Sequence, residues 1–111
     1  MKVDVETNQG VSVVHAAGRL DAITAPVLTD SLSKLLTTDT PRIVLDLTAV
    51  PFVSSAGLRV VLQAAKQVMG RGKFAVCGLV PAVRQVFDMA GFNRILTICE
   101  SPDSAVTAAA S

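Results

Sequence analysis

Residues 42–58, with the sequence RIVLDLTAVPFVSSAGL, decide the fold of this chain. From Arg42 to Leu47 the stretch is almost continuously apolar, which is typical of a strand covered on both faces of a sheet. After the turn at residues 54–57, apolar residues recur at helical spacing until Gly70 ends the pattern. These residues are Leu58, Val61, Leu62, Ala65, Val68 and Met69. The segment therefore predicts a buried strand that leads through a serine-rich turn into an amphipathic helix.

Upstream of this unit, the sequence predicts a hairpin followed by a helix. Two valine-rich runs, residues 2–7 and residues 11–16, flank Gln9-Gly10, which is a turn signal. Thr24, with a proline two residues later, predicts a helix N-terminus that the threonine caps. One face of that helix is expected to carry Leu28, Leu32 and Leu35.

Downstream, the alternation of strands and helices continues. Residues 73–79 predict a buried strand, and Pro81 and Gly91 mark the two ends of a helix. Residues 95–99 predict a last short strand, and the alanine-rich end from Pro102 predicts a terminal helix. We therefore expect an α/β fold: an open mixed sheet of about five strands, with about four helices packed against it and right-handed crossovers between parallel strands.

The composition limits the classes of function. A chain of 111 residues with 50% hydrophobic and 17% charged side chains predicts one domain, residues 1–111, whose core needs neither disulfide nor metal. A net charge of +1 and the lack of Trp and Tyr argue against a nucleic-acid platform. No apolar stretch is long enough to span a membrane and residues 1–10 lack a signal-peptide pattern, so we expect a cytoplasmic protein without direct membrane insertion.

Enzyme signatures are missing from the sequence. It contains no G-x-x-x-x-G-K-[ST], G-x-G-x-x-G, G-x-S-x-G or H-E-x-x-H motif. We interpret His15 as a hydrogen-bonded sheet histidine rather than a general base, and Asp46 as a partner of backbone or turn groups rather than a catalytic acid. Cys77 and Cys99 lie in apolar runs and are predicted to be core thiols. No enzyme activity, cofactor or metal is expected.

The turn at residues 54–57 is the strongest candidate site. The first N–H groups of a helix lack partners within the helix and carry partial positive charge, so an anion there is stabilised. A serine at this place could carry phosphate, which adds about −1.5 to −2 charge at neutral pH. The residues alone favour a simpler role, in which Ser54 is the N-cap and Ser55 an ordinary residue of the first turn.

Three motifs, taken in order, resemble those of the STAS-domain anti-sigma-factor antagonists, also called anti-anti-sigma factors. Residues 43–58 (IVLDLTAVPFVSSAGL) are similar to the signature of that family, residues 18–21 (GRLD) to its G-x-L-D motif, and residues 87–91 (FDMAG) to its late F-x-x-x-G segment. The resemblance covers nearly the whole chain in one register. It implies the STAS fold and a regulator that acts by binding.

The resemblance also implies a partner switch. The unmodified antagonist binds an anti-sigma serine kinase of the GHKL type and thereby releases the sigma factor. Phosphorylation by that kinase ends the complex, and a metal-dependent serine phosphatase resets it. The family motif places the phosphate on Ser55, with Ser54 as the second candidate. Ser54 stands where the family often has Asp, and Ala56 where it often has Ser or Thr, so a carboxylate and a competing hydroxyl are missing.

Partner contacts are expected around the turn and along the helix that follows. Residues 51–100 contain six Lys+Arg and two Asp+Glu, against four and six in residues 1–50, so an acidic partner surface would suit this half. Arg59 is expected near Ser55. The predicted partner-binding residues are Asp21, Ser54, Ala56, Gly57, Arg59, Val60 and Gln63.

Several of these residues have structural alternatives. Asp21 could instead form the turn before the first helix, and Gly57 could serve close packing. Val60 and Ala64 share a predicted helix face with Gln63 and Gln67, which is either a contact patch or ordinary surface.

Two other functions stay open from the sequence. One is a STAS-like accessory subunit of a lipid or solute transport complex, whose serine need not be phosphorylated. The other is a small hydrolase or nucleotide-binding protein that uses Asp46, Ser55 or His15. Only the partner switch makes a phosphorylated Ser55 central.

Overall fold

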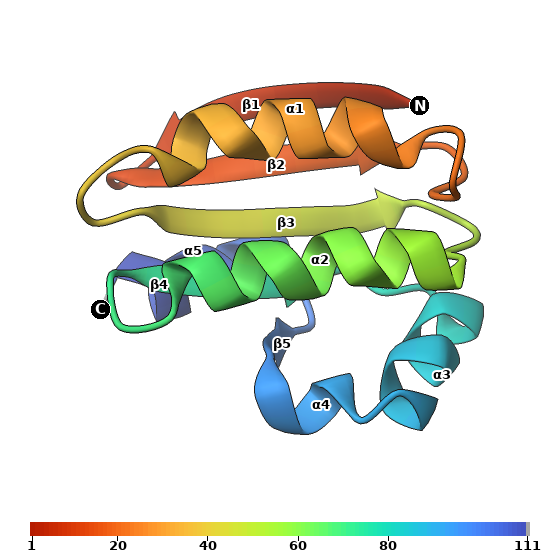
Figure 1. Ribbon diagram of the computed structural model, residues 1–111. Helices are drawn as coiled ribbons and strands as arrows, with labels where there is room; N and C mark the ends of the chain where they lie inside the picture. Colours follow the sequence, from red (N-terminus) through yellow and green to blue (C-terminus); the bar gives the residue numbers. More distant parts are fainter. Residues whose placement is uncertain (111) are drawn as a thin grey trace.

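The structure, a computed structural model that describes residues 1–110, is built on a five-stranded sheet with strand order β1-β2-β3-β4-β5 (Figure 1). The first two strands form an antiparallel hairpin, and every later neighbour in the sheet is parallel. The expected mixed sheet is therefore confirmed. The strands are β1 (Lys2–Asn8), β2 (Val11–Ala17), β3 (Arg42–Ala49), β4 (Lys73–Cys77) and β5 (Thr97–Cys99).

Helices cover both faces of this sheet. On one face α1 (Ala25–Leu36) and α2 (Ser55–Val68) lie side by side, and α5 (Pro102–Ala110) lies behind the sheet (Figure 1). Two short helices, α3 (Pro81–Met89) and α4 (Phe92–Ile95), connect β4 to β5. None of the helices within residues 1–110 has both the length and the apolar character that a membrane crossing requires.

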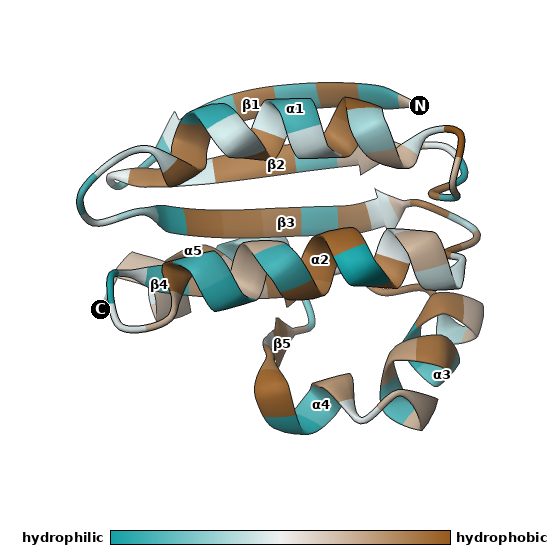
Figure 2. Cartoon of the chain, viewed as in Figure 1, coloured by the Kyte–Doolittle hydropathy of each residue, from teal (hydrophilic) through white to brown (hydrophobic). Residues whose placement is uncertain are grey.

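The continuous apolar run of β3 is explained by its central position. Ile43, Leu45 and Leu47 are buried in the core under α1 and α2, whereas Val44 is buried in the second core, under α5. Because successive strand residues point to opposite faces, a strand covered on both sides needs apolar residues at consecutive positions. Figure 2 shows this strand as mostly hydrophobic, between two helices along which hydrophobic and hydrophilic stretches alternate.

Two strand boundaries and one helix differ from the prediction. The fourth strand ends at Cys77 rather than Leu79, and the fifth begins at Thr97 rather than Ile95. Residues 92–95 instead form the four-residue helix α4, which brings the number of helices within residues 1–110 to five. One turn of helix is too short to show a helical period, so periodicity could not separate α4 from the strand that follows.

The start of α1 also differs from the prediction. Thr24 occupies the N-cap position, but its hydroxyl does not cap the helix; it donates to the Arg19 carbonyl oxygen at 2.7 Å. The turn is formed by Asp21, whose carboxylate accepts from the N–H groups of Ile23 and Thr24 at 3.0 and 3.1 Å. Along the same helix, Leu36 is buried and Leu35 only partly so.

Candidate functional site

Two segments far apart in the sequence meet where β2 and β3 end. Leu20 forms a β-bridge with Val53, in which the Leu20 N–H donates to Phe52 O and the Leu20 carbonyl oxygen accepts from the Ser54 N–H, each at 2.9 Å. The carboxyl ends of parallel strands lie at one edge of a sheet, which is why the loops after β2 and β3 can pair. The bridge places Asp21 beside the serine turn, as expected. We call this region, residues 19–24 and 52–59, the switch edge.

The two serines of the turn have different environments. Ser54 is the N-cap of α2, where its Oγ accepts from the Gly57 N–H at 3.3 Å, and it is partly buried. Ser55 is the first residue of α2 and is exposed. No acidic residue lies in the first turn of this helix, so α2 itself supplies no carboxylate to offset the partial positive charge of its N-terminus. Ser55 therefore offers an accessible hydroxyl, whereas the Ser54 hydroxyl stabilises the start of α2.

Gly57 lies behind the switch edge rather than on its surface. A Cβ built at this position would lie 2.7 Å from the Leu20 Cγ, 2.9 Å from the Leu20 carbonyl oxygen and 3.1 Å from the Val53 Cγ1. These distances are shorter than normal van der Waals contacts, so only glycine lets α2 approach the β-bridge this closely. The geometry supports the packing interpretation of Gly57.

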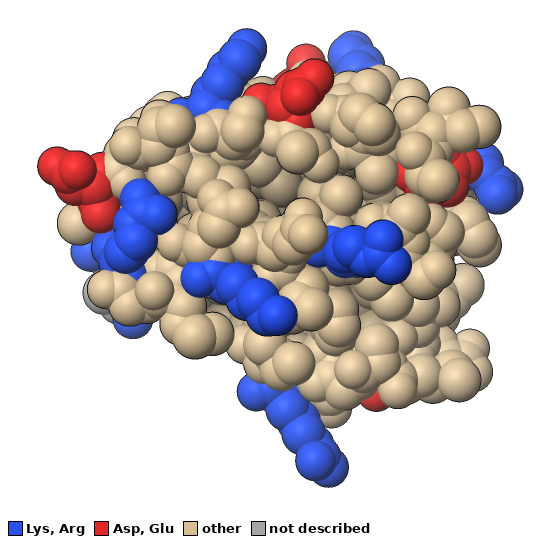
Figure 3. All heavy atoms as spheres, in the orientation of Figure 1, with Lys and Arg blue, Asp and Glu red and all other residues tan. Residues whose placement is uncertain are grey.

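The outer surface of α2 agrees only in part with the prediction. Arg59 and Gln63 are exposed and Val60 is partly buried, but Ala64 is only 3% exposed and belongs to the core, so the expected exposed face through Ala64 is wrong. The reason is α1, which packs along this side of α2 and leaves only a shallow groove that Val60, Gln63 and Gln67 line. Lys and Arg side chains lie across the α2 side of the molecule in Figure 3.

Sequence reasoning missed two apolar residues at the switch edge. Ile23 is 87% exposed and Phe52 is 41% exposed, although both are large hydrophobic side chains. The Arg19 guanidinium lies 4.4 Å from the centroid of the Phe52 ring, a cation–π contact that links the two paired segments. Exposed apolar residues that lie together at one edge of a protein are typical of a protein contact. The sequence does not show that these two residues are exposed, because a large apolar residue in a loop can equally be buried.

A second polar cluster ties three strands together on the sheet. His15 Nδ1 lies 2.7 Å from the Asp46 Oδ2 and His15 Nε2 lies 2.7 Å from the Glu6 Oε1. The hydrogen bond with Glu6, supported by Asp46, raises the pKa of His15 despite partial burial. Burial alone would raise the pKa of Asp46, but hydrogen bonds from Thr48 and His15 outweigh it and lower that pKa. The prediction of a hydrogen-bonded sheet histidine is confirmed.

The thiols give no sign of reactivity. Cys77 is fully buried, and burial raises its pKa to about 12, so the nucleophilic thiolate is negligible at neutral pH. Cys99 pairs with Cys77 in register across β4 and β5 and is only partly buried, so the prediction of two core thiols holds fully for Cys77 alone. Within residues 1–110, no group of three or more His, Cys, Asp or Glu side chains is placed to hold a metal ion.

We expect the His15 cluster to make stability depend on pH. A pKa that folding raises above 6.5 means that the native state binds the proton more tightly, so this stabilisation is complete below pH 6.5 and is lost as pH rises through the folded-state pKa. Because the side chain is 35% exposed, the loss is at most about 1 kcal/mol. Urea unfolding between pH 5.5 and 8.5 measures it. The His15→Gln variant should lack this slope, and an identical slope in both proteins would contradict the assignment.

Comparisons with known proteins identify the family. The family model described as the STAS domain matches residues 2–105. The putative anti-sigma factor antagonist BtrV of Bordetella bronchiseptica is 35% identical over 97% of this chain and 94% of its own length, and an anti-sigma F factor antagonist of Paenibacillus polymyxa is 29% identical over 96% and 93%.

Solved structures agree with the fold. The crystal structure of an anti-sigma factor antagonist from Mycobacterium paratuberculosis superposes with a TM-score of 0.92 at 30% identity, covering 99% of this chain and 94% of that one. SpoIIAA in its unphosphorylated form has the same fold, with a TM-score of 0.77 at 19% identity over 96% and 95% of the two chains. The chain therefore belongs to the STAS domain family and, within it, to the anti-sigma factor antagonists, which are regulators rather than enzymes.

Proposed function

We propose that this protein is the antagonist of a partner switch whose phosphorylated residue is Ser55. The unmodified chain binds an anti-sigma serine kinase of the GHKL type and frees the sigma factor, and phosphate on Ser55 ends that complex. The observation that carries the proposal is the difference between the two serines of the turn. Ser55 is exposed at the start of α2, whereas the Ser54 hydroxyl caps the helix. A metal-dependent serine phosphatase, a cytoplasmic location and the absence of a nucleic-acid partner belong to the same proposal.

The surface around Ser55 supports a protein partner. Ile23 and Phe52 offer exposed apolar side chains, and Arg19 and Arg59 are exposed cations of the same switch edge. Such a surface fits a partner that has an apolar depression surrounded by acidic groups. Asp21 supports this surface indirectly, because its carboxylate holds the turn that carries Ile23.

Phosphate at Ser55 would weaken the binding of this surface to its partner. It places a charge of about −1.5 to −2 where the complex excludes water, and burying that charge opposite acidic groups costs a few kcal/mol. In the free chain the phosphate stays solvated, and Arg59, one helical turn further on, lies within reach of it. Both effects favour the dissociated state.

The modified residue can be mapped directly. Incubation with a candidate anti-sigma kinase and MgATP, followed by peptide mass spectrometry, should place a single phosphate on Ser55. The Ser55→Ala variant should take up none, and the Ser54→Ala variant should still be phosphorylated. Phosphate on Ser54, or unchanged uptake by Ser55→Ala, would contradict the assignment. Co-purification with a transporter ATPase and no phosphate on this peptide would favour the transport-subunit alternative.

A further inference from the structure

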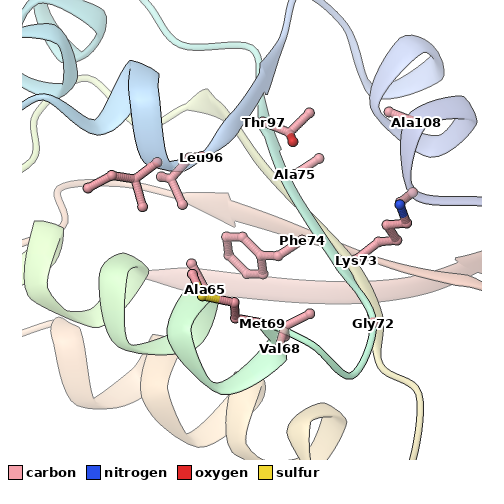
Figure 4. A pocket seen from close by; sticks show the side chains of 12 residues that line it. Ala65, Val68, Met69, Gly72, Lys73, Phe74, Ala75, Leu96, Thr97 and Ala108 are labelled. Atoms are coloured by element: carbon pink, nitrogen blue, oxygen red, sulfur yellow. The ribbon is translucent and has the colours of Figure 1, made fainter.

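A hollow of about 240 Å³ lies at the end of α2 opposite Ser55, between the end of that helix, the start of β4, β5 and the end of α5 (Figure 4). It exists because β5 is short. The first residue of β5, Thr97, pairs with Ala75, so the outer edge of β4 at Lys73 and Phe74 has no neighbouring strand. Small residues, among them Gly72 and Ala108, leave this space open.

The hollow has an apolar side and a polar side. Consecutive residues of a strand point to opposite faces, so Phe74 directs its ring toward Ala65 of α2 and Met69 just after that helix, whereas Lys73 extends on the other side, along α5 (Figure 4). The apolar side reaches the surface, since Met69 is 67% exposed and Ile95 is 52% exposed. Thr97 adds a hydroxyl on the side of Lys73.

The charged side chains nearest to the hollow in sequence are cations. Lys73 is the charged residue among those that line it, and the charged residues directly adjacent in sequence to its lining are also cations. These neighbours are Lys66, Arg94 and Arg71, the last of which is held by the carbonyl oxygens of Leu36 and Thr38. The lining contains no acidic side chain, so the Lys73 ammonium can pair with an anionic group there against the partial negative charge of the carboxyl-terminal ends of α2 and α5.

We propose that this hollow binds a small amphiphilic anion, with its hydrocarbon chain against Phe74 and Met69 and its acidic head toward Lys73 and Thr97. The size limits the chain. Sites for drug-sized ligands have volumes of about 300–1,000 Å³, and a cavity of about 150 Å³ holds benzene, so the space fits a chain of about six to eight carbons. Octanoate is accordingly the probe of choice. The site is separate from the switch edge, and its occupation does not depend on the modification of Ser55.

The test is a titration of the full chain, labelled with ¹³C in its methyl groups, with octanoate and with octanol. Octanoate should shift the methyl signals of Met69, Ile95 and Leu96 saturably and should bind at least about 5-fold more tightly than octanol, because only octanoate carries the charge that Lys73 attracts. Lys73→Met should remove this preference and leave octanol binding unchanged. Lys66→Met, which removes a neighbouring cation outside the lining, should retain most of it.

A second variant tests the location independently of charge. Ala108→Leu places a larger side chain in the hollow and should weaken both ligands at least about 10-fold, while Ser55→Ala should bind octanoate as the parent does. Melting curves of each variant verify the fold. Equal binding of octanoate and octanol by the parent, shifts confined to other methyl groups, or unchanged octanoate binding by both Lys73→Met and a folded Ala108→Leu would overturn the proposal.

Discussion

Replacing Gly57 by valine is expected to lower the free energy of unfolding by about 3 kcal/mol, because overpacking at a buried contact costs this much. The new side chain would start 2.9 Å from the Leu20 carbonyl oxygen. That oxygen cannot move away freely, since it accepts from the Ser54 N–H while the Leu20 N–H donates to Phe52. The gain in helix propensity over glycine, about 0.4 kcal/mol, does not offset the clash.

Ala56→Val is the matched control for this prediction. It adds the same β-branched side chain one residue earlier, at a partly exposed position of the same helical turn. We expect a loss below about 1 kcal/mol, which reflects helix propensity alone. Urea unfolding of both variants measures the difference. Equal losses would show that the close approach of α2 to the β-bridge does not depend on the glycine.

Replacing Ser55 by aspartate is expected to weaken binding without lowering stability. A carboxylate at the first residue of α2 interacts favourably with the helix N-terminus, which is worth about 0.3–1 kcal/mol, so the melting temperature should stay constant or rise slightly. Affinity for the anti-sigma factor should fall about 10-fold or more, because the complex must bury that charge. A general loss of structure would instead lower both quantities.

Two neighbouring variants separate charge from the loss of the hydroxyl. Ser55→Ala should bind the anti-sigma factor within about 3-fold of the parent, since it adds no charge to bury. Ser54→Ala should lose about 1 kcal/mol of stability, because its Oγ no longer accepts from the Gly57 N–H. Calorimetric titration and thermal melting supply both readouts. Equal affinities of Ser55→Asp and Ser55→Ala would count against the mechanism.

The parts of the fold that could be predicted are those in which local pattern and tertiary environment agree. The apolar run of β3 identifies a strand covered on both faces, and the residues after the serine turn identify an amphipathic helix that begins at Ser55. The placement of Asp21 beside this turn came from the family resemblance rather than from the residues themselves. The β-bridge between Leu20 and Val53 gives that placement its physical cause.

The parts that could not be predicted depend on contacts between distant segments. Ala64 is buried because α1 lies against it, and a helical pattern alone does not reveal which neighbour a helix face will meet. His15 is joined to a carboxylate 31 residues away, which no local motif encodes. Arg71 donates to the carbonyl oxygens of Leu36, the last residue of α1, and of Thr38, a role that depends only on tertiary proximity.

The most direct test of the central claim compares one chain in two states. The protein, prepared unmodified and with phosphate on Ser55 verified by mass spectrometry, is titrated into its anti-sigma factor by calorimetry at one salt concentration. We predict that the phosphorylated form binds at least about 100-fold more weakly, the equivalent of about 2.7 kcal/mol, with an unchanged far-UV circular dichroism spectrum. Equal affinities of the two forms would contradict the account.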